Sequence, residues 1–409
     1  MKKFLVLLLV ALMAFVPAMS ASAVTLTIET WRPDDTDNWL QILDVYMAEN
    51  PDVVLTYEGI TSKEYNATLR TQLETGKGPD IIMARSYENG QKLYEDGYLG
   101  DCSGIPGVQE NFAASSLAPW QMPDGTMFAV PTAAVQQIVF YNKTFFDENS
   151  YEVPETFEDF LAVCQAIVDA NDNPDFSPLA NGVKDEWDIL ECPFLGMLPN
   201  YVGGADQRVL YEDGEKKLND EAFVEAYADF QKLAPYLPAS YTAVGNGDSQ
   251  NLFVLERAAM WIDGSWSAGS IAAMEPDFEW GVFAIPAPAG KATAICFHPD
   301  FAMTFNTASE NIDAAKDFLA WMITEEGAKT VANLLPAGFY PMVSFPITLD
   351  DPHANESLQL NAGKETDARF IWPKMQDLYV PMNLELIALL AGTQTPQAAA
   401  DTIAELYGK

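Results

Sequence analysis

Residues 24–57 read VTLTIETWRPDDTDNWLQILDVYMAENPDVVLTY, and this stretch decides the fold class. Its first seven residues alternate apolar and polar side chains, which is typical of a β-strand with one buried face. From Thr36 onward, apolar residues recur at helical spacing until Asn50-Pro51 ends the pattern. Residues 53–57 predict a second strand. Because strands alternate with helices, the sequence predicts an α/β sheet that binds ligands at its strand ends.

The same alternation continues along the chain. We expect a helix over 64–75, a strand over 80–84 and an extended segment from 128 to 142. A helix follows Pro154 and is capped by Thr156, with Asp159 where a capping box prefers Glu. Further strands are expected over 258–263, 279–285 and 301–306, and further helices near 221–233, from Asn311, from Thr324, over 384–391 and from Pro396.

The N-terminus predicts export. Met1-Lys2-Lys3 is positive, residues 4–19 are nearly all apolar, and Ala21-Ser22-Ala23 has the small residues that precede signal-peptidase cleavage. A membrane anchor is the weaker interpretation, because the uninterrupted apolar run is short for the roughly 20 residues that span a bilayer. The first cysteine is Cys102, so no cysteine stands at a lipid-attachment position. We expect residues 1–23 to be removed and the mature protein to be free outside the cytoplasm, most naturally in a periplasm.

The composition narrows the classes of partner. The 409 residues include 22 Lys+Arg and 59 Asp+Glu, giving a formal net charge of −37. Hydrophobic residues at 49% and aromatic residues at 12% exclude a disordered acidic chain. The acid excess argues against nucleic acid and anionic lipid as partners. It is typical of a well-solvated surface and does not by itself indicate a cationic ligand.

The metal-binding and nucleophilic residue types form no recognisable motif. The two histidines are 55 residues apart, and the sequence contains no CxxC, GxSxG, HExxH, P-loop or GxGxxG. We therefore expect no cofactor, no metal and no catalytic residues. The four cysteines predict no particular disulfide pairing, and Cys164, on an apolar helix face, is expected to be a buried free thiol. The cysteines are Cys102, Cys164, Cys192 and Cys296.

Four segments, in order along nearly the whole mature chain, carry a resemblance to a known family. They are residues 78–82 (GPDII), residues 125–131 (GTMFAVP) with 141–143 (YNK) and 154–160 (PETFEDF), residues 258–266 (AAMWIDGSW) and residues 314–319 (AAKDFL). Each alone is weak. Together they resemble the family 1 extracellular solute-binding proteins of ABC importers, the maltose-binding-protein-like, sugar-binding group.

The resemblance implies a two-lobed periplasmic-binding-protein fold of type II, with crossing strands as the hinge. The crossings are expected near Val135-Gln136, near 280–284 and around 336–345. Both lobes are then discontinuous: lobe 1 is 24–135 plus 285–338, and lobe 2 is 136–284 plus 339–409. The implied function is capture of a mono- or oligosaccharide between the lobes by a monomer, followed by unaltered delivery to membrane permease subunits of an ABC importer.

A saccharide has C–H faces and a rim of hydroxyls, so its site needs flat aromatic rings and strong hydrogen-bonding side chains. The chain has 9 Trp and 16 Tyr, although most of them must form the core. Two loops at strand ends carry suitable side chains, and the first could equally be a solvated turn. They offer Trp31, Arg32, Asp34 and Asp35 after the first strand, and Arg85, Tyr87 and Glu88 after residues 80–84.

The resemblance adds three aromatic or acidic positions. It implies a stacking ring at Trp266, a hydroxyl-binding acid at Glu191 and a late aromatic at Tyr379. Glu191 is equally compatible with a solvated charge, and Tyr379 with core packing. Relatives often have Trp where this chain has Ala84, so that stacking surface is expected to be missing or moved to Tyr87.

The remaining candidates are polar residues near the expected hinge and the far lobe. His298 and Asp300 stand where many relatives have a Gly-rich stretch, which is expected to reshape specificity. Gln136 adjoins the first crossing, and Tyr201 is placed to line the far lobe. Asp263 is placed to bond hydroxyls or to cap the following helix, and capping is the commoner role.

Two other functions stay open from the sequence. A polyamine or other cationic solute would also use aromatic rings, paired with several converging carboxylates. A secreted glycoside hydrolase would have a similar composition, with two carboxylates flanking the scissile bond. The net charge mildly favours the cationic ligand, whereas the order of the four segments favours a sugar.

Overall fold

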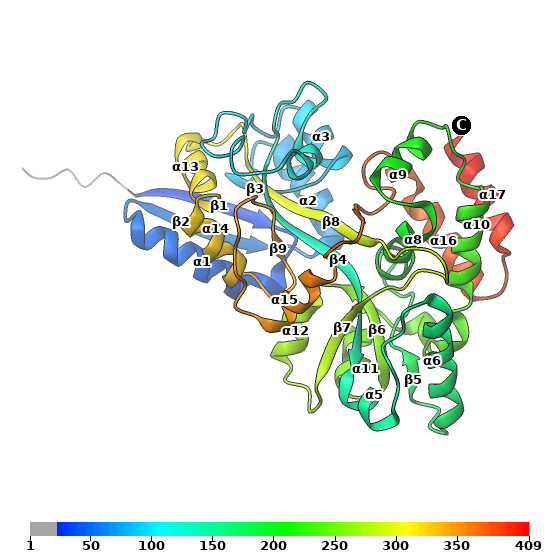
Figure 1. Ribbon diagram of the computed structural model, residues 1–409. Helices are drawn as coiled ribbons and strands as arrows, with labels where there is room; N and C mark the ends of the chain where they lie inside the picture. Colours follow the sequence, from blue (N-terminus) through cyan, green and yellow to red (C-terminus); the bar gives the residue numbers. More distant parts are fainter. Residues whose placement is uncertain (1–22, 409) are drawn as a thin grey trace, which may run out of the picture.

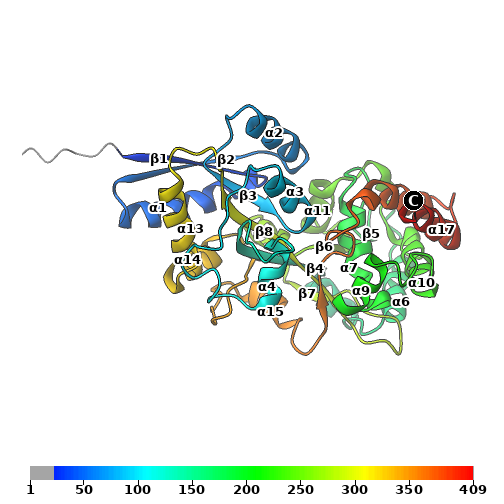
Figure 2. The same cartoon turned by 90° about the horizontal axis from the view of Figure 1, so that it is seen from above.

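The computed structural model describes residues 23–408, so the predicted signal peptide, apart from its last residue Ala23, lies outside the described residues. Two groups of elements stand side by side, joined by the long strands β4 (Val130–Asn142) and β8 (Ile295–Phe305) (Figures 1 and 2). We call the group that contains the N-terminal strands the first half and the group that contains the C-terminal helices the second half.

The strands follow the order β2-β1-β3-β8-β4-β6-β5, with β7 and β9 also paired to β4, and β10 to β8. Strand β1 pairs in parallel with β2 and β3, as the alternation of strands and helices predicts. The remaining strands are β1 (Val24–Thr30), β2 (Val53–Gly59), β3 (Ile81–Arg85), β5 (Ser177–Leu179), β6 (Ala258–Gly264), β7 (Trp280–Ala284), β9 (Tyr340–Pro341) and β10 (Thr366–Asp367).

Two strands pass from one half to the other. Residues 130–136 of β4 pair with β8, and residues 137–142 pair with β6 and β7. Strand β8 pairs with β10 at its start and with β3 at its end. The crossing expected near 280–284 therefore differs from the structure, because β7 pairs only with the second half of β4 and the strand that crosses is β8.

Helices of the first half cover a core of buried rings that includes Trp39, Tyr65 and Phe318. Tyr65, Leu69 and Leu73 all face inward, as the helical spacing predicts. These helices are α1 (Thr36–Glu49), α2 (Ser62–Glu74), α3 (Glu88–Glu95), α4 (Ala114–Leu117), α13 (Ile312–Met322) and α14 (Glu325–Leu334).

The second half has its own core, built around Phe194, Tyr227 and Phe370. A π-helical turn at Leu190–Phe194 leads into α7 (Leu195–Met197) and α8 (Pro199–Val202). The other helices are α5 (Lys143–Asn149), α6 (Phe157–Ala170), α9 (Ala205–Glu212), α10 (Glu221–Gln231), α11 (Asn246–Val254), α12 (Ser267–Ala273), α15 (Pro352–Gln359), α16 (Tyr379–Leu390) and α17 (Pro396–Tyr407).

Local sequence signals set the ends of several helices. Thr156 and Asp159 form a complete capping box at α6, so Asp serves where Glu is preferred. Thr395 caps α17, whose first residue is Pro396. Helix α1 follows Asp35, whose side chain forms no capping hydrogen bond. All four cysteines are buried and free, which confirms the interpretation of Cys164.

Ser265 ties three segments together where the halves meet. Its hydroxyl accepts a hydrogen bond from the Gln136 backbone N–H (3.0 Å) and donates to the Gly338 carbonyl (2.6 Å). Its own N–H donates to the Gln136 carbonyl (2.7 Å). Gly338 has φ +100°, and a Cβ there would lie 1.7 Å from the Ser265 carbonyl oxygen, so only glycine fits.

Candidate functional site

The loop after β1 presents one aromatic ring and one internally paired cation. Trp31 is buried, with edge contacts to Tyr65 and Phe301. Arg32 donates to both carboxylate oxygens of Asp35, at 2.6 and 3.0 Å, so its charge is already compensated within the loop.

The loop after β3 reaches from the first half to the second. The half-buried guanidinium of Arg85 lies 4.2 Å from the ring centroid of Trp31 and 5.7 Å from that of Trp372 in the second half. It donates to Ser62 Oγ at 3.1 Å, and none of the described carboxylates forms a salt bridge with it. Tyr87 has φ +55°, rare for a non-glycine residue, and its ring packs against the core of the second half.

Arg369, a buried cation in the irregular segment before α16, pairs with two acidic side chains. Arg369 Nη1 lies 2.7 Å from Glu191 Oε2, and Nη2 lies 3.9 Å from Asp300 Oδ1. The Tyr379 hydroxyl donates to the other oxygen of Glu191 at 2.5 Å. The backbone N–H of Arg369 donates to Nδ1 of His298 at 3.3 Å. Arg369 thus contacts side chains from two other parts of the sequence, the π-helical turn and β8.

Burial and these charges shift the pKa values in opposing directions. Burial raises the pKa of Asp300, while the Arg369, Arg85 and Arg32 guanidiniums oppose that rise. Burial alone would lower the pKa of Arg369, but Glu191 and Asp300 raise it overall. Burial lowers the pKa of His298 well below its usual value, and Arg369 lowers it further, so the ring is neutral near pH 7.

Four aromatic rings surround these charges. Arg369 lies over Trp266 and Trp372, at 5.3 and 5.5 Å from the ring centroids. Trp372 contacts both His298 and Tyr379. Trp187 meets Trp266 edge-on at 6.1 Å, and both rings are half-buried. Trp266 follows β6 of the second half but packs against the core of the first.

Contacts therefore join ten residues into one group, here called the interlobe cluster. They are Trp31, Arg85, Trp187, Glu191, Trp266, His298, Asp300, Arg369, Trp372 and Tyr379. The cluster combines flat apolar faces with guanidinium, carboxylate and phenol groups from both halves. Such a set can stack on ring faces and exchange hydrogen bonds with hydroxyls.

Several predicted residues have other partners and no described contact with the cluster. Asp34 is exposed, and Glu88 pairs with Lys92 of its own helix at 2.9 Å. Gln136 donates to the Ser357 carbonyl at 2.7 Å, which anchors α15 to β4. The Tyr201 hydroxyl donates to Asp229 at 2.9 Å.

Asp263 also lies apart from the cluster and is fully buried. It accepts hydrogen bonds from Ser267, Cys192 and Asn246. The expected capping role is absent among the described contacts, because the carboxylate binds the Ser267 hydroxyl and no backbone N–H of α12.

Sequence reasoning missed Trp187, Arg369 and Trp372. Arg369-Phe370-Ile371-Trp372 places one of only 22 basic residues beside a tryptophan in an apolar stretch. An isolated arginine of this kind needs a buried partner, which was a usable signal. Trp187 follows Asp185-Glu186, and these acidic neighbours are typical of a solvated loop, so the sequence did not indicate a site residue there.

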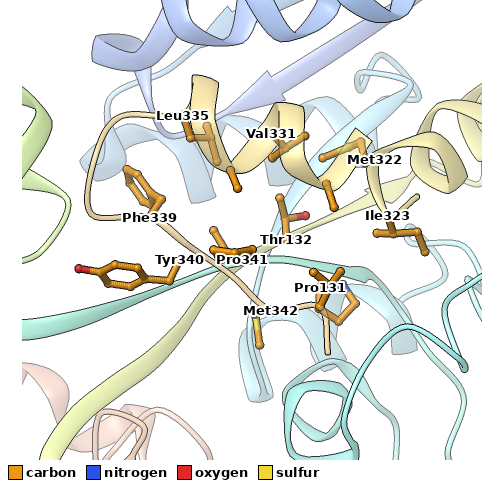
Figure 3. A pocket seen from close by; sticks show the side chains of 14 residues that line it. Pro131, Thr132, Met322, Ile323, Val331, Leu335, Phe339, Tyr340, Pro341 and Met342 are labelled. Atoms are coloured by element: carbon orange, nitrogen blue, oxygen red, sulfur yellow. The ribbon is translucent and has the colours of Figure 1, made fainter. Parts of the chain in front are cut away.

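A separate small cavity lies between α14 and the segment around β9, and no residue of the interlobe cluster lines it. Figure 3 shows Val331 of α14, and Leu335 directly after this helix, above Tyr340 and Pro341. The space open to the centre of a water molecule is about 20 Å³, enough for about one water and far too small for a sugar ring.

Among the helices of residues 23–408, none has the length and apolar character needed to cross a membrane.

Comparison with known proteins finds relatives that are all binding proteins. Residues 32–329 match the family described as bacterial extracellular solute-binding protein. The chain is 21% identical to the multiple sugar-binding protein of Streptococcus mutans, over 81% of this chain and 77% of that protein. It is 24% identical to the maltotriose-binding protein of Pyrococcus abyssi, over 84% of this chain and 71% of the other.

A solved structure supports the same fold. It comes from work on xylan utilization by the thermophilic bacterium Caldanaerobius polysaccharolyticus, and it superposes with a TM-score of 0.81 at 17% identity. The match covers 94% of this chain and 100% of that one. The two-lobed α/β fold expected from the four segments is thereby confirmed, and the chain belongs to the bacterial extracellular solute-binding proteins.

Proposed function

We propose that the protein captures a mono- or oligosaccharide at the interlobe cluster and hands it, unaltered, to the permease subunits of an ABC importer. The observation that carries the proposal is the cluster itself, in which Arg85 of the first half approaches Trp372 of the second at 5.7 Å. A ligand that touches both halves favours the closed state by its differential affinity. The Streptococcus relative is a multiple sugar-binding protein and the Pyrococcus relative a maltotriose-binding protein, which supports a sugar as that ligand.

The charges of the cluster favour a sugar over a polyamine. Glu191 is already bound by Arg369, and Asp35 by Arg32. Arg85 adds a guanidinium without a described carboxylate partner. A polycation would meet the two arginines of the cluster, Arg85 and Arg369, whereas hydroxyl groups can accept from guanidiniums and donate to carboxylates.

The lobe boundaries are part of the proposal. The first boundary between the lobes stays between residues 135 and 136, and the third stays near residues 338 and 339. The pairing of β8 supports a second crossing inside Ile295–Phe305 in place of position 285. The hydrogen bonds of Asn200 to residues 285 and 294 support the same shift. Cleavage of the signal peptide after Ala23, a periplasmic location, a monomeric state and the lack of catalysis complete the proposal.

Tryptophan fluorescence titration with parallel panels of saccharides and polyamines tests the ligand class. We expect a saturable change with at least one saccharide and none with polyamines. Solution scattering with that saccharide should show a smaller radius of gyration, and chromatography should recover the sugar intact. Cleavage products, saturable binding of polyamines alone, or an unchanged shape with every saccharide would overturn the proposal.

A further inference from the structure

A second polar group is fully enclosed in the second half, next in sequence to cluster residues. Asp188 and Cys192 stand one helical turn apart, flanking Glu191, and Asp263 lies near the end of β6. All three side chains have 0% exposure. One carboxylate oxygen of each aspartate and the Cys192 sulfur all lie within 4.8 Å of one another. None of these residues is part of the interlobe cluster.

The hydrogen bonds in this group leave one side chain unsatisfied. Asp263 accepts from Ser267 Oγ at 2.5 Å, from Cys192 Sγ at 3.1 Å and from Asn246 Nδ2 at 3.3 Å. Neither oxygen of Asp188 has a hydrogen-bond partner among the described residues, although both are buried. A buried carboxylate without partners is strongly unfavourable. The Asp188 carboxylate therefore needs a hydrogen-bond donor or a cation that the described residues do not provide.

The charges point the same way. Burial raises the pKa of Asp188 well above its usual value and the Asp263 carboxylate raises it further, while the Asn246 amide opposes the shift. Burial also raises the pKa of Asp263, to about 6. Arg369 is the cation that acts on Cys192, but it is already bound to Glu191.

We propose that Asp188, Cys192 and Asp263 bind a divalent zinc ion. Two carboxylates and a thiolate are ligands that Zn²⁺ takes, and the sulfur disfavours Mg²⁺ and Ca²⁺. On binding, the S–H bond of Cys192 and the O–H bond of each protonated carboxyl break, bonds from zinc to sulfur and to the carboxylate oxygens form, and the released protons leave to solvent. The ion supplies the partner that Asp188 lacks and compensates both carboxylates. This site is independent of the saccharide proposal, since it rests on contacts outside the cluster.

Metal retention by the whole mature protein tests the site. Protein stripped with a chelator is dialysed against ZnCl₂, then against metal-free buffer, and its zinc is measured by mass spectrometry. We expect about one zinc per chain and a higher melting temperature, because an ion that binds only the native state stabilises it. Co²⁺ in place of Zn²⁺ should give a thiolate-to-cobalt charge-transfer band. Less than one tenth of a zinc per chain, or a cobalt complex without that band, overturns the proposal.

Matched variants distinguish this site from ions held by the acidic surface. Asp188→Asn keeps the size of the side chain and should lower zinc retention at least tenfold, and Cys192→Ser should abolish the cobalt band. Cys164→Ser is the control, because Cys164 is also a buried free thiol but lies on α6. Unchanged retention in Asp188→Asn, or equal loss in Cys164→Ser, contradicts the assignment. Should a variant fail to fold, the retention and cobalt spectrum of the parent protein still decide.

Discussion

Arg369 Nη1 lies 2.7 Å from Glu191 Oε2, in a pair whose side chains are only 3% and 12% exposed. The two residues come from the irregular segment before α16 and from the π-helical turn, so their contact joins distant parts of the second half. A buried pair is costly to break, because removing one partner leaves the other charge without compensation.

Arg369→Met should therefore destabilise the protein by about 3–5 kcal/mol. The remaining Glu191 carboxylate would keep only the Tyr379 hydroxyl among its described partners. The double variant Glu191→Gln/Arg369→Met should recover much of the loss, since it leaves no unpaired charge at that pair. Urea unfolding followed by circular dichroism measures both changes.

An exposed pair provides the control for this experiment. Arg70 bonds Glu74 and Asp96 at the surface, where its side chain is 43% exposed. Arg70→Met should cost less than about 1 kcal/mol. A loss as large as that of Arg369→Met would mean that burial is not the cause of the difference.

Gly338→Ala should disrupt the junction of the halves. The new Cβ would collide with the Ser265 carbonyl, and φ +100° is strained for any L-residue with a side chain. We expect a loss of about 3 kcal/mol or more in unfolding free energy. Gly363→Ala is the matched control, because Gly363 also has a positive φ (+70°) but has no heavy atom within 4 Å of the added Cβ. Only the strain of about 1–2 kcal/mol applies there. Equal losses in the two variants would contradict the role of the Ser265 contact.

His298 should make stability fall as the pH falls below about 6.5. Its native pKa is depressed by burial and by Arg369, Arg85 and Arg208, whereas the unfolded chain takes up a proton near the usual value. In that window the unfolded state binds more protons, so acid favours unfolding by up to about 1.4 kcal/mol per pH unit. His298→Gln should remove this slope, measured by urea unfolding between pH 5.0 and 6.5.

The comparison must be differential, because a buried acid with a raised pKa changes the pH dependence of stability with the opposite sign. Asp300 has a raised pKa and contributes equally to parent and variant, so its effect largely cancels in their difference. His353→Gln, at the chain's other histidine, is the matched variant for the loss of a histidine. Identical slopes for the parent and His298→Gln would show that His298 is not the titrating group.

Local sequence patterns predicted the strands and helices, because alternation, helical spacing and caps each depend only on residues that are close in the sequence. Period-two alternation located β1, helical spacing located the buried face of α2, and a Thr-Pro pair located the start of α17. The second crossing was misplaced because β7 and β8 both have strand patterns. Whether β7 or β8 pairs with both halves depends on strand register. The alternation of apolar and polar residues along a strand does not by itself determine that register.

The site was harder to predict because long-range contacts define it. Loops at strand ends suggested Trp31 and Arg85, and the structure brings the two together at 4.2 Å, since the end of a strand fixes where they lie. Arg369 and Trp372 lie in a segment without helical or strand periodicity, and their partners come from four other parts of the chain. Tyr201 has a ring of the right type, but its hydroxyl is bound by Asp229 of α10, a contact that no local pattern reveals.

Trp266→Ala should weaken saccharide binding by about 30-fold or more, which corresponds to roughly 2 kcal/mol. The Trp266 ring contacts both Trp187 and Arg369, is half-buried and packs on the first half although it belongs to the second. It is therefore placed to stack on a sugar ring and to sense closure of the lobes. Fluorescence titration measures the affinity, and calorimetry should show a melting temperature without ligand close to that of the parent.

Trp321→Ala controls for the loss of a half-buried tryptophan elsewhere. Trp321 packs on Phe318 and Tyr46, and its Nε1–H donates to Glu49 on the outer side of α1. Its removal should leave the saccharide affinity unchanged. If Trp266→Ala bound the sugar within twofold of the parent, Trp266 would have no contact with the ligand. The stacking surface would then have to come from Trp187, Trp372 or Tyr379, which the corresponding alanine variants would identify.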